Sequence, residues 1–246
     1  MVRGYVISDL HMFSKRSSYE QNRKLLETAM ADARFFVLNG DIFDFRWSRH
    51  GSSEATAIAA IEVLKQFTAS YPQCLFYFVL GNHDSVSPFV SCLEDAARDW
   101  PNFAWDPHYV QLGKKLFIHG DAAHAGGELE RLVRYRKNFE ESRARGPLLE
   151  AAYEIATVLR LHRTLSYSVP KKQTIKNILR FLEHLTPGVT GTLTDIYFGH
   201  THLPFTDYQY KHWTFHNTGA MIRGIPFYLL ELEVAEESLW TKTIKK

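Results

Sequence analysis

Five short clusters of metal-binding residue types are spread along the sequence, and each follows directly on an apolar run. Their members are Asp9 and His11, Asp41, Asn82, His119, and His200 with His202. Carboxylate, amide and imidazole ligands together suit Mn²⁺, Fe or Zn²⁺ better than a thiolate site would. Seven candidate ligands are too many for one tetrahedral zinc ion. They fit two ions about 3.5–4 Å apart, with the two carboxylate oxygens of Asp41 as the bridge.

The spacing within the clusters suggests how the ligands are presented. Asp9 and His11 stand two residues apart, as do His200 and His202. In an extended segment, such residues point to the same side of the chain, so each pair is expected to offer two ligands together. Gly40 precedes Asp41 and would let the backbone turn to aim the carboxylate.

The apolar runs before the clusters are predicted to be strands. They are short and rich in Val, Ile, Phe and Tyr, as strands buried on both faces are. The runs and their clusters cover 3–11, 34–44, 74–84, 115–121 and 195–202. Helical periodicity between them, at 20–33 and 54–70, indicates an α/β fold. Because open α/β sheets bind ligands outside the carboxyl ends of their strands, this fold would bring the five clusters together.

The segment from about 125 to 190 differs from the rest, since it is predicted to contain helices and no strands. The predicted helices cover 127–144, 147–167 and 172–186. We interpret the segment as a helical cap inserted into a single domain that spans 1–246. After it, the stretches 208–220 and 226–234 are expected to form antiparallel strands.

Composition argues against several classes of protein. The net charge is only +2, and the chain has no basic stripe with interleaved aromatic residues, so a nucleic-acid partner is not expected. Cys74 and Cys92 form no CxxC pair and are interpreted as reduced core residues. The apolar stretches are too short for a signal peptide or for the roughly 18 residues of a membrane span. A cytoplasmic protein is predicted, and peripheral membrane contact and oligomeric state are left open.

The motifs SDLH, GDIFD, GNHD, HGD and GHTH, in this order, resemble those of the calcineurin-like metallophosphoesterases. The resemblance covers residues 5–202 and implies a sandwich of two sheets flanked by helices (αββα). It implies two divalent ions, with Mn²⁺ expected first. One ion would be held by Asp9, His11, Asp41 and His202, and the other by Asp41, Asn82, His119 and His200. Water acidified by the ions would attack phosphorus in line.

The resemblance also assigns roles beyond the metal ligands. His83 would donate to the leaving oxygen or stabilise charge on the phosphoryl group. Asp84 would orient His83 as a dyad. Asp44 is expected to fix the orientation of a ligand. Apart from the resemblance, Arg46 and Trp47 follow Asp44 in a loop after a strand and are expected to rim the site and bind substrate, with simple packing as the alternative for Trp47.

The predicted helix at 127–144 carries several basic residues balanced by glutamates. Most of them are interpreted as a solvated face, and Arg131 and Arg134 are those expected to reach the substrate. His124, just past HGD, is interpreted first as an ordinary residue, with a place lining the pocket as the alternative.

The first prediction for the function is hydrolysis of a phosphoester or pyrophosphate bond in a phosphorylated small molecule. The helical insertion and GDIFDF also resemble the UDP-2,3-diacylglucosamine diphosphatases, which makes a lipid-nucleotide substrate the second prediction. His83 departs from that family, which typically has arginine after the metal-binding asparagine. A nuclease is a further alternative, and a non-catalytic metal-binding scaffold is the alternative from another class.

Overall fold

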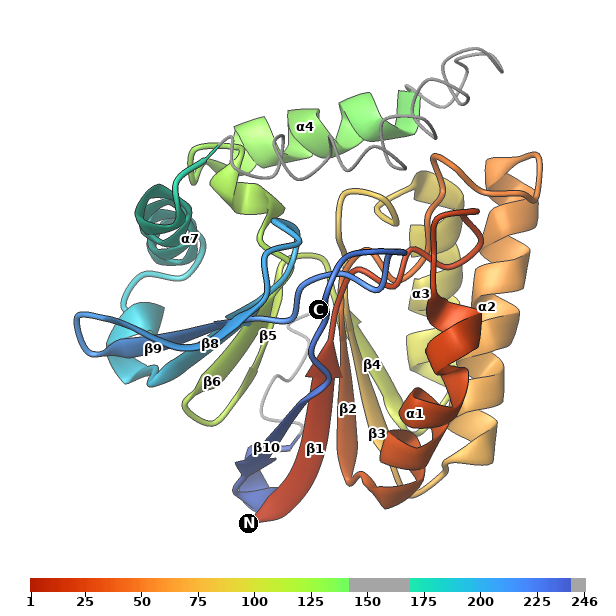
Figure 1. Cartoon of the computed structure of the whole chain (residues 1–246), viewed down its shortest axis with the longest axis horizontal. Helices are drawn as coiled ribbons and strands as arrows, with labels where there is room; N and C mark the ends of the chain where they lie inside the picture. Colours follow the sequence, from red (N-terminus) through yellow and green to blue (C-terminus); the bar gives the residue numbers. More distant parts are fainter. Residues whose placement is uncertain (142–168, 240–246) are drawn as a thin grey trace.

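The computed structural model describes residues 1–141 and 169–239, which form two five-stranded sheets packed face to face (Figure 1). The first sheet has the order β10-β1-β2-β3-β4. Its strands are β1 (Val2–Ile7), β2 (Phe35–Asn39), β3 (Leu75–Val79), β4 (Phe103–Asp106) and β10 (Leu230–Val234). The strands β1 to β4 run parallel, and β10 pairs antiparallel with β1.

The second sheet has the order β5-β6-β7-β9-β8. Its strands are β5 (Tyr109–Leu112), β6 (Lys115–Ile118), β7 (Asp195–Phe198), β8 (Phe205–Tyr210) and β9 (Trp213–Asn217). The central strands β6, β7 and β9 are parallel, and the edge strands β5 and β8 are antiparallel to their neighbours.

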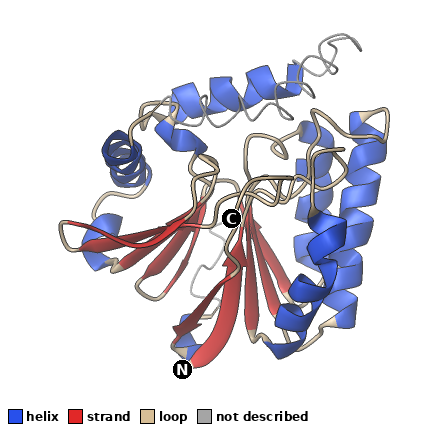
Figure 2. Cartoon of the chain, viewed as in Figure 1, coloured by secondary structure: helices blue, strands red, loops and turns tan. Residues whose placement is uncertain are grey.

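Helices cover the outer faces of both sheets (Figure 2). The first sheet is covered by α1 (Tyr19–Asp32), α2 (Ser53–Ser70) and α3 (Ser87–Asp99), and the second by α7 (Lys171–Leu185). Helix α4 (Leu129–Glu141) crosses above the carboxyl ends of the strands. The predicted α/β class, with two sheets flanked by helices, is confirmed.

Strand β2 shows why the apolar runs are unbroken. All five of its residues are buried. Phe36 and Leu38 belong to the core under the helices, whereas Phe35 and Val37 belong to the core between the sheets. Alternate residues of a strand point to opposite faces, so a strand with a covered face on each side needs apolar residues throughout. Each such side chain stabilises the fold by roughly 1.5–3 kcal/mol.

Asn39, the last residue of β2, connects the two sheets at their ligand-bearing end. Its side-chain amide donates to the carbonyl oxygen of Ile118 at 3.1 Å and to that of Tyr197 at 3.2 Å. These carbonyls lie in β6 and β7 of the second sheet. The loops that follow β2, β6 and β7 are therefore held next to one another.

The predicted elements agree with the observed ones to within a few residues. The helices predicted at 20–33, 54–70 and 172–186 are α1, α2 and α7, and the helix at 127–144 is described as α4 up to residue 141. The helix predicted at 147–167 lies outside the described residues, so the cap as an inserted unit stays a prediction. Helix α3 and the four-residue strands β4 and β5 were not predicted. The stretch 226–234 contains β10, which is antiparallel to β1, and the stretch 208–220 contains β9, which is antiparallel to β8 and parallel to β7.

Within residues 1–141 and 169–239, no helix has the length and apolar character needed to cross a membrane. Cys74 is buried in the core under the helices and Cys92 is half-buried, and neither forms a disulfide.

Candidate metal centre

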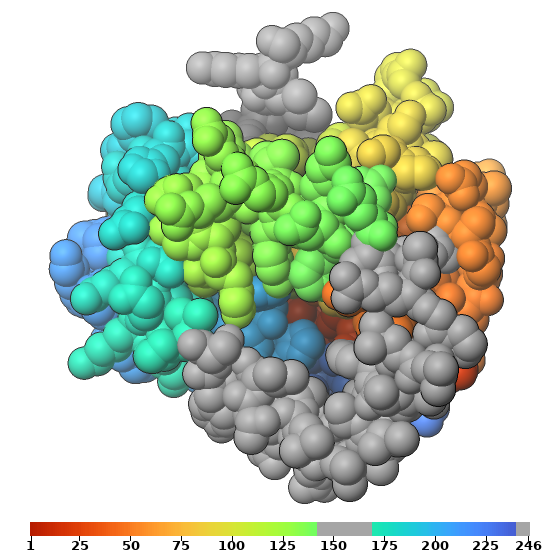
Figure 3. Space-filling model, turned by 90° about the horizontal axis from the view of Figure 1, so that it is seen from above, coloured from red at the N-terminus to blue at the C-terminus, as the bar shows by residue number. Residues whose placement is uncertain are grey.

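The five clusters lie in the loops at the carboxyl ends of β1, β2, β3, β6 and β7, on the side that α4 crosses. Figure 3 looks down on this side and shows a hollow beside α4, in which the N-terminal part of the chain and its C-terminal third are both visible. Of the predicted ligands, His200 and His202 are half-buried, and the other members are buried: Asp9, His11, Asp41, Asn82 and His119.

One group of converging ligand atoms comes from Asp9, His11 and His202. His202 Nε2 lies 3.1 Å from Asp9 Oδ1 and 3.4 Å from His11 Nε2. His11 Nε2 lies 3.8 Å from the same carboxylate oxygen. Two imidazole nitrogens and a carboxylate oxygen that face a common point suit a divalent cation.

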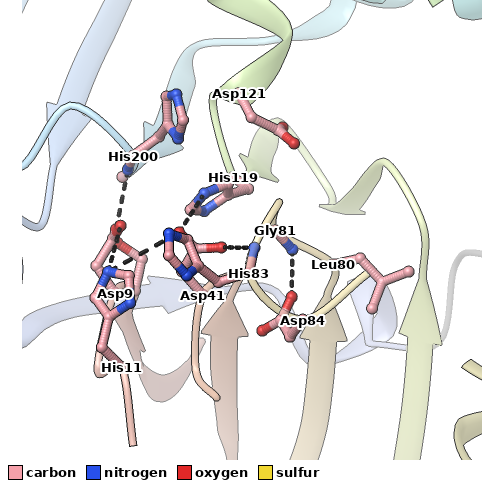
Figure 4. Close-up of polar contacts among 12 residues, drawn as sticks. Asp9, His11, Asp41, Leu80, Gly81, His83, Asp84, His119, Asp121 and His200 are labelled. Atoms are coloured by element: carbon pink, nitrogen blue, oxygen red, sulfur yellow. Dashed lines mark hydrogen bonds and ion pairs between the residues drawn. The ribbon is translucent and has the colours of Figure 1, made fainter. Parts of the chain in front are cut away.

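A second group is formed by Asp41, His119 and His200. His119 Nε2 lies 3.3 Å from Asp41 Oδ2. The same oxygen lies 3.9 Å from His11 Nε2, which belongs to the first group. Asp41 therefore stands between the two groups, where a shared ligand would have to be (Figure 4).

Asn82 adds an observation in favour of a cation. Its side-chain oxygen Oδ1 is buried and has no hydrogen-bond partner. A buried acceptor without a partner costs about 1–3 kcal/mol. A cation held in the same pocket would satisfy this oxygen, so the residues present fit a metal centre.

The backbone presents the ligands in an unexpected way. Left-handed backbone conformations with positive φ occur at Asp9 (53°), His11 (45°), Asp41 (52°), His200 (62°) and His202 (56°). The expectation that each i, i+2 pair lies in an extended segment is therefore wrong. Asp9 and His11 still meet in one group because the chain turns sharply after the strand end, whereas His200 and His202 belong to different groups. Such conformations cost of order 1–3 kcal/mol each and persist only where the surroundings hold them.

Hydrogen bonds between the loops supply that support. The Asp9 backbone N–H donates to Gly40 O at 2.9 Å, and the His11 N–H to Asp41 O at 3.0 Å. The His200 N–H donates to Asp9 Oδ2 at 2.9 Å. Three ligand loops are thus joined to one another.

Two glycines make room for the ligands. Gly40 has φ of 84°, which is the predicted bend before Asp41, and a Cβ at this position would meet the ring of His119. A Cβ at Gly81 would meet the Asp41 carboxylate itself. These positions need glycine because the ligand side chains occupy the space.

The charges around Asp41 favour its ionised form. Burial by itself raises the pKa of Asp41, but the charges of His119 and His83 outweigh it and hold the pKa well below the usual range. Burial lowers the pKa of His119, yet the Asp41 and Asp9 carboxylates raise that pKa to about 10. A cation that binds at Asp41 would take the place of this proton.

Two of the histidines are neutral, as ligation requires. Burial, together with the charge of Arg16, lowers the pKa of His11 to about 4. Burial and the charges of His119 and His124 lower the pKa of His200 well below its usual value. A neutral imidazole keeps a lone pair for a metal ion.

His83 is oriented by a different carboxylate from the one predicted. Its Nδ1 lies 2.9 Å from Asp44 Oδ1. One oxygen of Asp84 instead accepts the backbone N–H of Gly81 at 2.6 Å (Figure 4). The other accepts the backbone N–H of Ile42 at 2.9 Å. The predicted dyad of Asp84 and His83 is therefore wrong. Burial and the neighbouring Asp41 charge raise the pKa of Asp84 to about 7. The contacts of Asp84 with Gly81 and Ile42 join the loops that follow β3 and β2.

Asp44 holds a ligand as well as His83. Its Oδ2 lies 3.3 Å from His11 Nδ1, on the side of the ring opposite the ligand group. The same oxygen accepts a hydrogen bond from Arg16 at 2.9 Å. Asp44 was expected to fix the orientation of a ligand, and its contact with His11 agrees with this expectation. The contact of Asp44 with Arg16 was not predicted.

Of the predicted substrate-binding residues, Arg46 and Trp47 lie near the rim. The Arg46 guanidinium lies 5.3 Å from the Trp47 ring centre and 5.0 Å from that of Phe139 in α4. Arg46 and Phe139 line a small hollow together with Asn82 and His83. This places Arg46 next to the candidate catalytic residue.

Arg131 and Arg134 are exposed on α4, and Arg131 pairs with Glu128 at 2.8 Å. Their role in substrate binding stays a prediction. Two aromatic residues of α4 lie against the candidate ligands and His83. Phe139 lies 5.1 Å from His83 between ring centres, and Tyr135 lies 6.2 Å from His200.

His124 was interpreted as an ordinary residue, but its Nδ1 lies 2.8 Å from His200 Nε2. That interpretation is corrected. The residue stands five positions after His119, just beyond the short helix Asp121–Ala123, and its place in the HGDAAH stretch was the available signal.

Arg136 anchors α4 to the ligand loops. It is buried, and its guanidinium donates to both carboxylate oxygens of Asp121 at 2.7 and 3.1 Å. It also donates to the carbonyls of Leu80 at 2.8 Å and Pro107 at 2.7 Å. Asp121 belongs to HGD and Leu80 precedes GNHD, so one side chain ties α4 to two of the five loops.

The calcineurin-like phosphoesterase family model matches residues 3–204 of this chain. The matched range contains all five ligand loops. A search among curated proteins found no match. Members of the family typically use divalent metal ions, in agreement with the three groups of converging ligand atoms, one of which joins His11 and Asp41 with His83. The order of the motifs, the two-sheet fold and the ligand groups around Asp41 lead to the same conclusion: the chain belongs to the calcineurin-like phosphoesterases.

Proposed function

We propose that the protein hydrolyses a phosphoester or pyrophosphate bond with the help of two divalent ions. The family supports metal-dependent phosphoester hydrolysis in general. The observation that carries the finer proposal is the position of Asp41 between two groups of ligand atoms. Such an arrangement suits two ions with one shared carboxylate.

In this proposal the ligands divide as the family resemblance implies. The first ion is held by Asp9, His11, Asp41 and His202, and the second by Asp41, Asn82, His119 and His200. Mn²⁺ is the first choice, with Fe or Zn²⁺ as alternatives, because the donors are nitrogen and oxygen atoms without thiolate. When bound, the ions would lower the pKa of a water molecule and stabilise charge on the phosphoryl oxygens.

His83 would act on the substrate. Its Nδ1 faces Asp44, which leaves Nε2 for the leaving oxygen or for a phosphoryl oxygen. Its ring stands edge-on to His11, with ring centres 4.8 Å apart, so it lies beside the first group of ligands. The contact with Asp44 fixes the orientation of the ring.

Replacement of His83 by alanine is expected to lower kcat by about 10²–10⁴-fold, the usual contribution of a general acid. The metal content should stay near that of the wild type, because His83 is not among the proposed ligands. Steady-state kinetics and elemental analysis of the same preparation would check this. His212→Ala, at the exposed turn between β8 and β9, is the matched control. Loss of metal in His83→Ala would show that His83 is a ligand instead.

The substrate proposed first is a phosphorylated small molecule, and a lipid-nucleotide is the second. Nucleic acid is not proposed, given the net charge of +2. The test uses purified protein with Mn²⁺ and three substrates side by side: an aryl phosphomonoester, an aryl phosphodiester and a UDP-linked acylated sugar. Asp41→Asn serves as the inactive control.

Turnover of any of the three substrates that requires the metal and disappears in Asp41→Asn would support the proposal. Selective turnover of the UDP-sugar would identify the lipid-nucleotide class. If two ions bind and none of the three is hydrolysed, the hydrolase proposal fails and a metal-binding scaffold is favoured.

A further inference from the structure

The ring of His200 lies between a ligand group and a second histidine. On one side it faces His119, with ring centres 5.1 Å apart and planes at 75°. On the other side its Nε2 lies 2.8 Å from His124 Nδ1, with ring centres 4.6 Å apart and planes at 79°. The two nitrogens of His200 therefore have different surroundings.

The short contact with His124 occupies Nε2 of His200, so Nδ1 is the nitrogen of His200 that can bind a cation. A distance of 2.8 Å between two imidazole nitrogens is a hydrogen bond, so one of them carries the hydrogen and the other accepts it. If Nε2 of His200 donates to Nδ1 of His124, then Nδ1 of His200 keeps its lone pair. That nitrogen is then the one available to the group that His200 forms with Asp41 and His119.

His124 is itself held in place by α4. Its ring is nearly parallel to that of Tyr135, with planes at 9° and centres 6.2 Å apart. Tyr135 also packs against Phe139, with ring centres 5.0 Å apart. Helix α4 is anchored by the buried pair of Arg136 with Asp121, three residues before His124. His124 therefore packs against α4 as well as against His200.

We propose that His124 is a positioning residue for the second metal ion: it accepts a hydrogen bond from His200 Nε2 and so keeps His200 Nδ1 aimed at Asp41 and His119. The proposal rests on the two-ion centre of the proposed function. Metal-binding histidines commonly donate their other N–H to a carboxylate, a backbone carbonyl or water, which fixes the ring and the tautomer. Here a neighbouring imidazole supplies the acceptor.

The test compares two substitutions at one position. His124→Leu removes the acceptor but keeps an apolar side chain against Tyr135. His124→Asn keeps an acceptor, because asparagine Oδ1 can stand close to where histidine has Nδ1. Mn²⁺ titrations of the metal-free proteins, with free Mn²⁺ followed by its EPR signal, give the two dissociation constants. Thermal unfolding of the same samples reports on the fold, and His212→Leu is the control at an exposed histidine.

His124→Leu is expected to weaken one of the two Mn²⁺ sites by about 10–100-fold, the usual effect of removing such a partner, and to leave the other unchanged. His124→Asn should recover most of that affinity. A purely structural role would instead weaken both sites together with the unfolding temperature. The proposal is overturned if His124→Leu binds both ions with wild-type affinity, if both sites weaken equally, or if the asparagine variant behaves like the leucine variant.

The outcomes separate this proposal from the proposed function. Two sites in the wild type, unaffected by His124→Leu, would reject the role of His124 and leave the hydrolase proposal standing. A site-selective loss in a protein that hydrolyses none of the three substrates would support the role of His124 and reject the hydrolase. A wild type that binds fewer than two ions would reject both.

Discussion

Asp41→Asn is expected to lose most of the bound metal and most of the hydrolytic activity together. In the proposed function Asp41 is the ligand that both ions share, and its Oδ2 lies 3.3 Å from His119 Nε2 and 3.9 Å from His11 Nε2. Asparagine keeps the shape but lacks the negative charge that attracts two cations to one side chain. Metal ions supply several kcal/mol of transition-state stabilisation, and their loss corresponds to a fall in kcat/KM of about 10³-fold or more.

The measurement pairs metal content after gel filtration with kcat/KM for a substrate found in the assay. The matched control is Asp207→Asn. Asp207 is an exposed aspartate that shares the left-handed backbone of Asp41, with φ of 58° against 52°. The same substitution on the same backbone conformation should leave metal and activity unchanged there. An Asp41→Asn variant that keeps two ions, or full activity, would contradict the two-ion arrangement.

Arg136→Met is expected to lower the free energy of unfolding by about 3–5 kcal/mol, the typical cost of removing one partner from a buried ion pair. The substitution leaves Asp121 buried without the guanidinium that meets both of its oxygens. It also leaves the carbonyls of Leu80 and Pro107 without a donor that they have in the native protein. Methionine fills much of the space, so the loss comes from charge and hydrogen bonding rather than from a cavity.

Urea unfolding followed by circular dichroism would measure the loss. Arg131→Met is the matched control, because it removes an arginine from the same helix by the same substitution. Arg131 is exposed and pairs with Glu128 three residues before it, and such surface pairs contribute about 0–1 kcal/mol. Equal losses in the two variants would show that Arg136 does not anchor α4.

The fold and the candidate ligands were readable from local features of the chain. The residues of β2 are all apolar up to Asn39 because each face of the strand is covered, and this leaves a signal within five residues. The ligands follow the strands directly, so the motif order also located them. Helix α3 was missed although it begins with Ser87 and Pro88, a common start for a helix. The strands β4 and β5 have only four residues each, too few for a clear pattern.

The partner of His83 could not be read in the same way. Asp84 is its neighbour in sequence, but its carboxylate turns to the backbone N–H groups of Gly81 and Ile42. The carboxylate that reaches His83 is that of Asp44, which follows another strand. Neighbours in a tight turn point in different directions, so closeness along the chain is a poor guide to which side chains meet.

The sequence by itself determined the class of fold, the family and the set of residues able to bind metal, because apolar periodicity and ligand types are properties of short segments. Only the tertiary structure decided how these residues are used: the left-handed turns that aim Asp9 and His11, the pairing of His83 with Asp44, and the contact of His124 with His200. Each depends on hydrogen bonds and packing between loops from different strands. Their energies are set by distances that exist only once the two sheets and α4 have come together.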